Sequence, residues 1–148
     1  MSQALDRMLI WEGISRYFFA MDALSDADAI LACFTDDASW ACYDHGCDEP
    51  SLAFDSRDDL DAVVRLQAAQ AGDVQLKHHL TGLVFDGIDE ARAVTRAKVL
   101  VTQQRPGDPA PRPRNTAECE GTWRRTGDGW RLQRWVVRRG PAGDADVA

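Results

Sequence analysis

The residues best suited to chemistry stand in the short run Lys77–Gly82 (KHHLTG), which holds two of the three histidines of the chain. An apolar stretch follows, and the turn Asp86–Asp89 closes it, a pattern typical of a strand that enters a hairpin. Successive side chains of a strand point to opposite faces, so only one of the two imidazoles can face the interior. We predict that His78 faces an enclosed pocket and His79 the other side. A neutral imidazole is a base near pH 7, so His78 is the candidate base.

A second candidate is Asp22, at the end of a helix expected from Gln3 to Asp22 and capped by Ser2. At about 100° per residue, Asp22 lies on the flank of the helix's apolar stripe, one turn after Phe18. A carboxylate beside a buried face, at the negative end of the helix dipole, is poorly placed for a charge. Asp22 therefore either ends the helix in solvent or has a functional partner. The stripe itself consists of Ile10, Ile14, Tyr17, Phe18 and Met21.

Composition narrows the class of protein. The chain has 148 residues, 45% of them apolar and 28% charged, as expected of one globular domain. A net charge of −7 argues against a nucleic-acid partner and gives no reason to expect binding to an anionic membrane. No secretory signal and no apolar run of about 18 residues is visible. The spacing of Cys42 and Cys47 suits zinc poorly, so we expect free thiols, no metal and a cytoplasmic location.

The elements that would position these residues begin with helices. Ser25–Asp28 resembles a capping box for a second, short helix, and Ala38–Tyr43 is predicted to form a strand. Asp44–Asp55 is predicted to be a loop. Another capping signal, Ser56–Asp59, opens a helix that Gly72 would end.

From residue 74 onward the pattern changes to long strands. Ala91–Gln104 alternates between small apolar residues on one face, which leave room for a cavity, and a partly cationic face that is wetted or forms an oligomer contact. We take residues 1–139 as one domain and residues 140–148 as a disordered tail. Helices first and antiparallel strands afterwards predict an α+β fold, with the helices on one face of a curved sheet. The expected strands are 74–86, 91–104, 116–125 and 130–138, with a proline-rich loop over 105–114.

Four short stretches resemble the SnoaL-like branch of the NTF2-like superfamily, close in pattern to scytalone dehydratase and hexachlorocyclohexane dehydrochlorinase. They are Tyr17–Asp22, Cys33–Trp40, His78–Gly82 and Gly129–Arg134, in the right order over most of the chain. The resemblance implies a cone in which a curved antiparallel sheet wraps a layer of helices and encloses an apolar pocket. Because this fold hosts enzymes and non-enzymes alike, the resemblance is less specific for the reaction.

The resemblance also implies a catalytic pair. In both enzymes an aspartate late in the first helix pairs with a histidine on the first long strand, and Asp22 and His78 match those positions. The implied activity is that of a lyase, a dehydratase or dehydrohalogenase that removes a carbon-bound proton from a small apolar, cyclic substrate. Such an elimination requires neither a metal nor an organic cofactor.

Seven residues are candidates for substrate binding on the same grounds. The second histidine of the dehydratase falls at Val101, and its tyrosine falls near Cys42 with Tyr43 one position away, so the chain does not match that enzyme's full relay. Trp40 and Arg134 match the dehydrochlorinase more closely, and Arg134 would either stabilise a leaving anion or form an ion pair at the pocket rim. The complete set is Tyr17, Phe18, Trp40, Cys42, Tyr43, Val101 and Arg134.

Two alternatives stay open. One is an isomerase or polyketide cyclase that uses Asp22 and His78 as its base. The other is a non-catalytic ligand-binding protein, or an accessory subunit such as the β subunit of ring-hydroxylating oxygenases. We expect a homodimer or homotrimer in either case.

Overall fold

The computed structural model of the chain describes residues 2–23, 26–70 and 72–141. Three helices occur in this part: α1 (Gln3–Ala23), α2 (Ala27–Leu31) and α3 (Arg57–Gln70). Six strands complete it: β1 (Phe34–Tyr43), β2 (Leu52–Phe54), β3 (Gln75–Ile88), β4 (Arg92–Gln104), β5 (Arg112–Thr126) and β6 (Gly129–Arg139). The predicted α+β class, with helices packed on a sheet, is confirmed.

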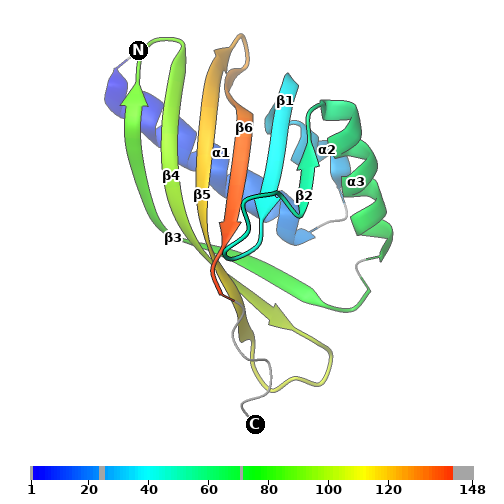
Figure 1. Cartoon of the computed structure of the whole chain (residues 1–148). Coiled ribbons are helices and arrows are strands. Elements are labelled where there is room, and N and C mark those ends of the chain that lie inside the picture. Colours follow the sequence, from blue (N-terminus) through cyan, green and yellow to red (C-terminus); the bar gives the residue numbers. More distant parts are fainter. Residues whose placement is uncertain (1, 24–25, 71, 142–148) are drawn as a thin grey trace.

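The strands form one sheet in the order β2-β1-β6-β5-β4-β3. All neighbours are antiparallel except β1 and β6, which are parallel, so the sheet is mixed. Figure 1 shows α1 lying across the back of the sheet, with α2 and α3 beside its β1–β2 end. We call the face toward α1 the inner face and the opposite one the outer face.

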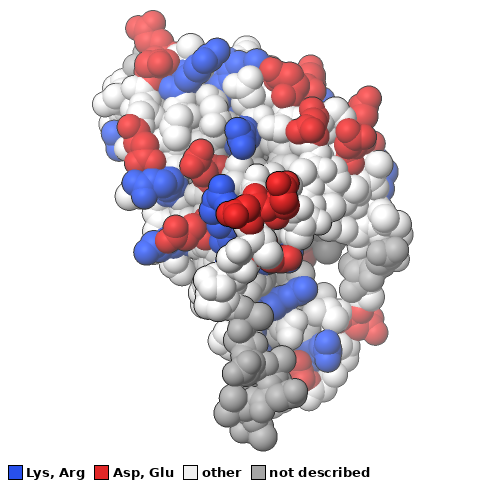
Figure 2. All heavy atoms as spheres, in the orientation of Figure 1, with Lys and Arg blue, Asp and Glu red and all other residues white. Residues whose placement is uncertain are grey.

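The two faces differ in charge. The inner side chains of β4, from Ala93 to Val101, are buried, and between them lie the exposed side chains of Arg96 and Lys98. Figure 2 shows basic and acidic side chains intermingled over the outer face. This strand alternates as its sequence predicts, because one face packs on the core and the other meets water.

The apolar stripe of α1 faces the inner side of the sheet. Ile10 and Ile14 have no exposed surface, and Tyr17 and Phe18 are buried beside them. Gly13 lets the helix approach closely, since a Cβ there would lie 3.1 Å from the ring of the fully buried Trp123. The start of the helix is capped as expected, because the Leu5 amide donates to the Ser2 hydroxyl at 3.4 Å.

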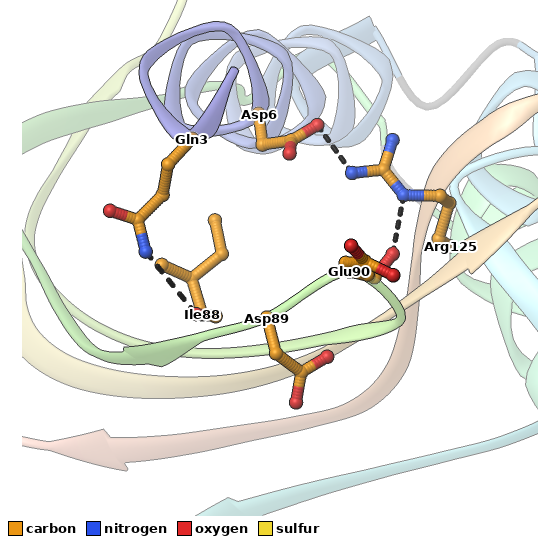
Figure 3. A pocket seen from close by; sticks show the side chains of 6 residues that line it. All are labelled: Gln3, Asp6, Ile88, Asp89, Glu90 and Arg125. Atoms are coloured by element: carbon orange, nitrogen blue, oxygen red, sulfur yellow. Dashed lines mark hydrogen bonds and ion pairs between the residues drawn. The ribbon is translucent and has the colours of Figure 1, made fainter. Parts of the chain in front are cut away.

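A buried ion pair holds the first turn of α1 against the last hairpin (Figure 3). The Asp6 carboxylate contacts the Arg125 guanidinium at 2.5 Å and accepts a hydrogen bond from the Trp130 indole at 3.1 Å. Hydrogen bonding to Arg125, and then to Trp130, lowers the pKa of Asp6. The Arg125 guanidinium also donates to the Glu90 carbonyl oxygen at 2.7 Å. This network ties α1 to the end of the sheet and so sets where its far end, with Asp22, can lie.

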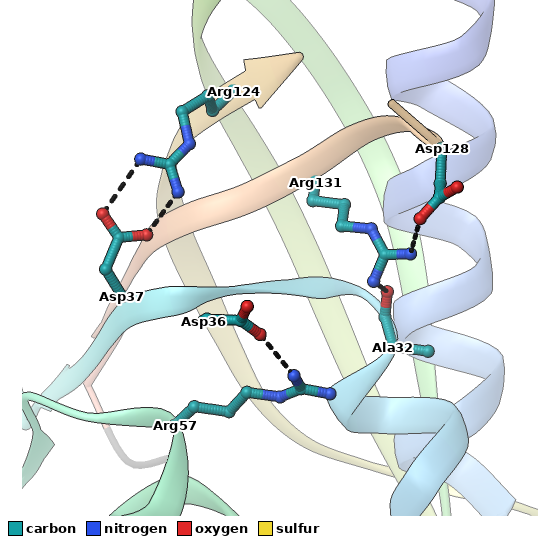
Figure 4. Close-up of polar contacts among 7 residues, drawn as sticks. All are labelled: Ala32, Asp36, Asp37, Arg57, Arg124, Asp128 and Arg131. Atoms are coloured by element: carbon teal, nitrogen blue, oxygen red, sulfur yellow. Dashed lines mark hydrogen bonds and ion pairs between the residues drawn. The ribbon is translucent and has the colours of Figure 1, made fainter. Parts of the chain in front are cut away.

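Four local expectations need correction. β5 begins at Arg112, inside the expected proline-rich loop, because Arg112 and Pro113 pair with the end of β4. β1 begins at Phe34 rather than Ala38. Arginines from other elements form ion pairs with Asp36 and Asp37 (Figure 4), so both aspartates can belong to the strand. Leu52–Phe54, expected inside a loop, forms the short strand β2 by pairing with β1. The N-cap of α2 is Asp26, whose side chain accepts from the Ala29 amide at 3.0 Å. Ser25 and residues 142–148 of the predicted tail lie outside the described residues.

The Asp37 pair makes stability depend on pH. Hydrogen bonds from Arg124, with a further one from Gln133, lower the pKa of Asp37 from 3.8 to about 2. A lowered folded-state pKa means that the pair stabilises the fold fully above about pH 4 and that this contribution is lost as the pH falls toward 2. Because the carboxylate is 54% exposed, screening limits the effect to about 1 kcal/mol or less.

We therefore expect Asp37→Asn to be slightly less stable than the wild type at pH 6, with the difference shrinking between pH 4 and 3. Urea unfolding at each pH measures this difference. Arg124→Gln serves as the partner control and should show the same convergence. A difference that stays constant from pH 6 to pH 3 would contradict the role of this pair.

Candidate functional site

The structure brings Asp22 and His78 together although 56 positions separate them in the chain. The Asp22 Oδ1 lies 2.6 Å from the His78 Nδ1. The backbone N–H of His78 donates to both carboxylate oxygens of Asp22, at 3.0 and 3.2 Å. One carboxylate therefore holds both the main chain and the ring of the same residue, which determines where the imidazole lies relative to α1.

This contact determines the tautomer of the imidazole. An ionised carboxylate can only accept, so the ring nitrogen facing it, Nδ1, must carry the proton. The other nitrogen, Nε2, then holds the lone pair of the neutral ring and can take up a proton. The negative charge on Asp22 would stabilise the imidazolium that results. The arrangement can act chemically as a general base.

The surroundings of His78 are apolar but not sealed. Its ring stacks on Phe18, with ring centroids 5.3 Å apart and an interplanar angle of 15°. The side chains of His78 and Asp22 are 20% and 22% exposed. Partial burial strengthens their interaction, while the remaining exposure leaves a small molecule a way to reach the ring.

Four of the other predicted residues lie on the inner face. Val101 pairs directly with His78 across β3 and β4 and is buried. The Trp40 indole donates a hydrogen bond to the Tyr17 hydroxyl at 3.2 Å. Burial raises the pKa of the Tyr17 hydroxyl well above its usual value. Burial also raises the pKa of the Cys42 thiol, so near neutral pH the thiol stays protonated and is no nucleophile.

The structure does not bring Tyr43 and Arg134 to this site. The Tyr43 ring lies 4.4 Å from the Arg138 guanidinium, and both residues are on the outer face. Arg134 is exposed, because β6 has an irregularity opposite Thr122 and Trp123 that adds one residue. A bulge of one residue reverses the alternation, so Trp135, and not Arg134, points inward.

Sequence reasoning missed Trp135, which is 1% exposed and packs edge-on against Tyr17 and Phe18 with ring centroids 5.7 and 6.2 Å away. It therefore supports the ring on which His78 stacks. The signal that could have found it is the size of its side chain, since tryptophan is highly buried on average.

Two hollows stand out in the described structure, and neither is lined by His78 or Asp22. One, of about 540 Å³, lies at the start of α1 around Gln3, Asp6, Asp89 and Arg125 (Figure 3). The other, of about 340 Å³, lies on the outer face beside Val84, Lys98, Glu118 and Arg138. Beside the pair itself, the aromatic side chains of Tyr17, Phe18, Trp40 and Trp135 occupy much of the inner face.

The described residues lack two kinds of feature. They contain no group of three or more His, Cys, Asp or Glu side chains close enough to hold a metal ion. None of the helices described is long and apolar enough to cross a membrane.

Comparisons with known proteins agree with this architecture. A family model described as the SnoaL-like domain matches residues 2–136. A search of curated proteins finds no match. A proposed aromatic ring hydroxylase from Novosphingobium aromaticivorans superposes with a TM-score of 0.78 at 23% identity, covering 97% of this chain and 95% of its own.

Two other solved structures resemble the chain at lower identity. A proposed scytalone dehydratase from Novosphingobium aromaticivorans has a TM-score of 0.77 at 16% identity, covering 98% of this chain and 91% of its own. The β subunit of benzoate 1,2-dioxygenase from Burkholderia mallei has a TM-score of 0.75 at 16% identity, with 88% of each chain covered. At these identities the likeness shows a common fold.

Proposed function

The chain belongs to the family of SnoaL-like domains, and on that premise we propose that it is a cofactor-independent lyase of the dehydratase or dehydrohalogenase type. Its substrate would be a small apolar, cyclic molecule. His78 is the base that removes a carbon-bound proton, and Asp22 holds it in place. The observation that carries this proposal is the 2.6 Å contact between Asp22 and the Nδ1 of His78.

The proposed step needs only these groups and the substrate. Nε2 of His78 takes a proton from carbon, and the electron pair of the broken C–H bond forms the new double bond. The bond to the leaving group on the adjacent carbon breaks, and hydroxide or halide departs with its electron pair. The Asp22 carboxylate stabilises the imidazolium, which then loses its proton to the departing hydroxide or to water. Return of the proton to a different carbon would make the same site an isomerase. Attack of the carbanion on a carbonyl carbon of the same molecule, with the proton passing from the imidazolium to the new alkoxide, would make it a cyclase.

The residues around the pair support an apolar substrate. Phe18, Val101 and Trp40 offer hydrocarbon and aromatic surface, and the Tyr17 hydroxyl and the Trp40 indole N–H are neutral polar groups among the aromatic side chains. An apolar wall of this kind favours a substrate of the same character. The four cysteines are free thiols, which accords with a reducing compartment such as the cytoplasm.

One observation favours a second candidate, a non-catalytic accessory subunit. Neither hollow is lined by His78 or Asp22, and large aromatic side chains fill much of the inner face. The resemblance to the β subunit of benzoate 1,2-dioxygenase fits such a role. In that case the pair between Asp22 and His78 would only fasten α1 to β3.

Hydrogen–deuterium exchange at carbon separates the two candidates before the leaving group is known. The protein is incubated in D2O with a panel of cyclic ketones, phenols and halogenated rings, and loss of C–H signals is followed by NMR. A carbon base should exchange or convert at least one class of compound faster than buffer does, without added metal or cofactor. Background rates throughout the panel, together with no ligand-induced rise in Tm, would favour the accessory subunit.

A further inference from the structure

The side of α1 that faces away from the sheet carries apolar side chains for which the proposed reaction has no use. In the described part of the chain seven large apolar side chains are exposed, and five of them stand on this one helix. Phe19 is 78% exposed, Met8 67% and Trp11 55%. The full set on α1, which we call the α1 outer patch, is Leu5, Met8, Leu9, Trp11 and Phe19.

Helix geometry places these residues along one side. At about 100° per residue, Leu5, Met8 and Phe19 project within about 60° of one another, and Leu9 and Trp11 flank them. They lie opposite Ile10 and Tyr17, so α1 is apolar on both sides. A helix that is apolar all round is typical of a buried position, and monomers rarely leave such a stripe open to water.

The charges within the patch are self-complementary. Glu12 and Arg16 form an ion pair across one helical turn in the middle of the helix. Both contacting nitrogens of Arg16 use the same oxygen, Oε1 of Glu12, at 3.0 and 2.6 Å. A second α1 laid antiparallel would present its own glutamate and arginine to the same two groups in reverse order, which is the condition for a two-fold symmetric contact.

We propose that the α1 outer patch is a two-fold interface on which the α1 of a second copy of this chain packs antiparallel. Phe19 of each copy then meets Leu5 and Met8 of the other, and Arg16 of each copy approaches Glu12 of the other. The net charge of −7 disfavours an anionic membrane as the occupant. The reciprocal charge pattern favours a second copy over an unrelated protein.

The outer face of the sheet, which the sequence suggests as an oligomer contact, is less suitable. Its exposed side chains are mostly charged, as with Arg96, which contacts both oxygens of Asp86 at 2.6 and 2.8 Å. Val84 is the one large apolar side chain on that face that is exposed among the described residues. The apolar surface available for association is therefore concentrated on α1.

Sedimentation velocity over a range of concentrations tests the proposal on the full chain. The wild type should form a dimer, and Phe19→Glu should raise the dimer Kd at least about 30-fold, as expected for loss of a central aromatic contact. Val84→Glu and Leu66→Glu are matched controls, since each puts the same charge on another exposed large apolar position outside α1, and both should dimerise like the wild type. Circular dichroism should show that all four proteins are folded.

A cross-linking experiment tests the symmetry. With the exposed Cys47 replaced by serine in every chain, a mixture of Glu12→Cys and Arg16→Cys chains should form a disulfide-linked dimer on mild oxidation, and a mixture of Leu66→Cys and Arg16→Cys chains should not. The proposal would be overturned if the wild type stayed monomeric up to about 1 mM or formed a trimer. It would also be overturned if Val84→Glu weakened dimerisation as much as Phe19→Glu, or if the protein were a monomer that sediments with phosphatidylcholine vesicles. None of these measurements involves a substrate. They therefore test the interface whether or not the protein proves to be a lyase.

Discussion

Replacing His78 by glutamine should lower the rate of proton removal from carbon by about 10²–10⁴-fold, the range that a positioned general base contributes. Glutamine can still donate a hydrogen bond to Asp22 through its amide, but it has no nitrogen that is basic near pH 7. The exchange of substrate C–H for C–D in D2O measures the effect directly. The far-UV circular dichroism spectrum should not change, because the side chain is partly exposed and lies on an edge strand.

Asp22→Asn should cause a loss of similar size by a different route. The carboxylate accepts from both the backbone N–H and the Nδ1 of His78, whereas a carboxamide offers a single oxygen. The ring then loses its preferred tautomer, and the imidazolium loses the charge that stabilises it. A loss of turnover in this variant with an unchanged fold would indicate that the aspartate acts through the histidine.

His79→Ala is the matched control for both substitutions. It removes the same ring one position away, from an exposed side chain that contacts Thr102 at 3.0 Å. We expect its activity to equal that of the wild type. Full activity in either His78→Gln or Asp22→Asn, or an equal loss in His79→Ala, would rule out the proposed base.

Replacing Trp135 by alanine should have the largest effect on stability, a loss of about 3–5 kcal/mol in the free energy of unfolding. Trp135 is 1% exposed and packs against Tyr17 and Phe18. The Trp135 ring is tightly packed, since a Cβ on its cross-strand neighbour Gly121 would lie 2.9 Å from it. Strands on both sides hold the backbone, so the cavity left by the indole would not close. Urea unfolding followed by circular dichroism measures the loss.

Arg134→Ala tests the register that the bulge in β6 imposes on the residues after it. This residue precedes Trp135 and is exposed on the outer face, so its removal should change the free energy of unfolding by no more than about 0.5 kcal/mol. If β6 alternated without the extra residue, Arg134 would point inward and Trp135 outward. Comparable losses in the two variants, or a larger loss for Arg134→Ala, would contradict the observed register.

The local pattern of apolar residues was sufficient to predict an element wherever one helical or strand period continues along its whole length. The stripe from Ile10 to Met21 and the cap at Ser2 predict α1 to within one residue at its end. The alternation of Ala91–Gln104 predicts which face of β4 is buried. Both signals are properties of neighbouring residues, because a helix or strand repeats its geometry every few positions. The same alternation predicts that His78 and His79 point to opposite faces, and the structure has His79 exposed and His78 partly buried.

The sequence by itself thus determined the order of the helices and of every strand except β2, and the buried side of the regular elements. Through family resemblance it also identified Asp22 and His78, the two residues that meet. Only the tertiary structure decided that β1 runs parallel beside β6, that Leu52–Phe54 joins the sheet, and that Arg134 faces water while Trp135 faces the core. The physical reason is that pairing and bulges are set by the strand alongside, which lies far away in the sequence. One inserted residue reverses the faces of everything after it.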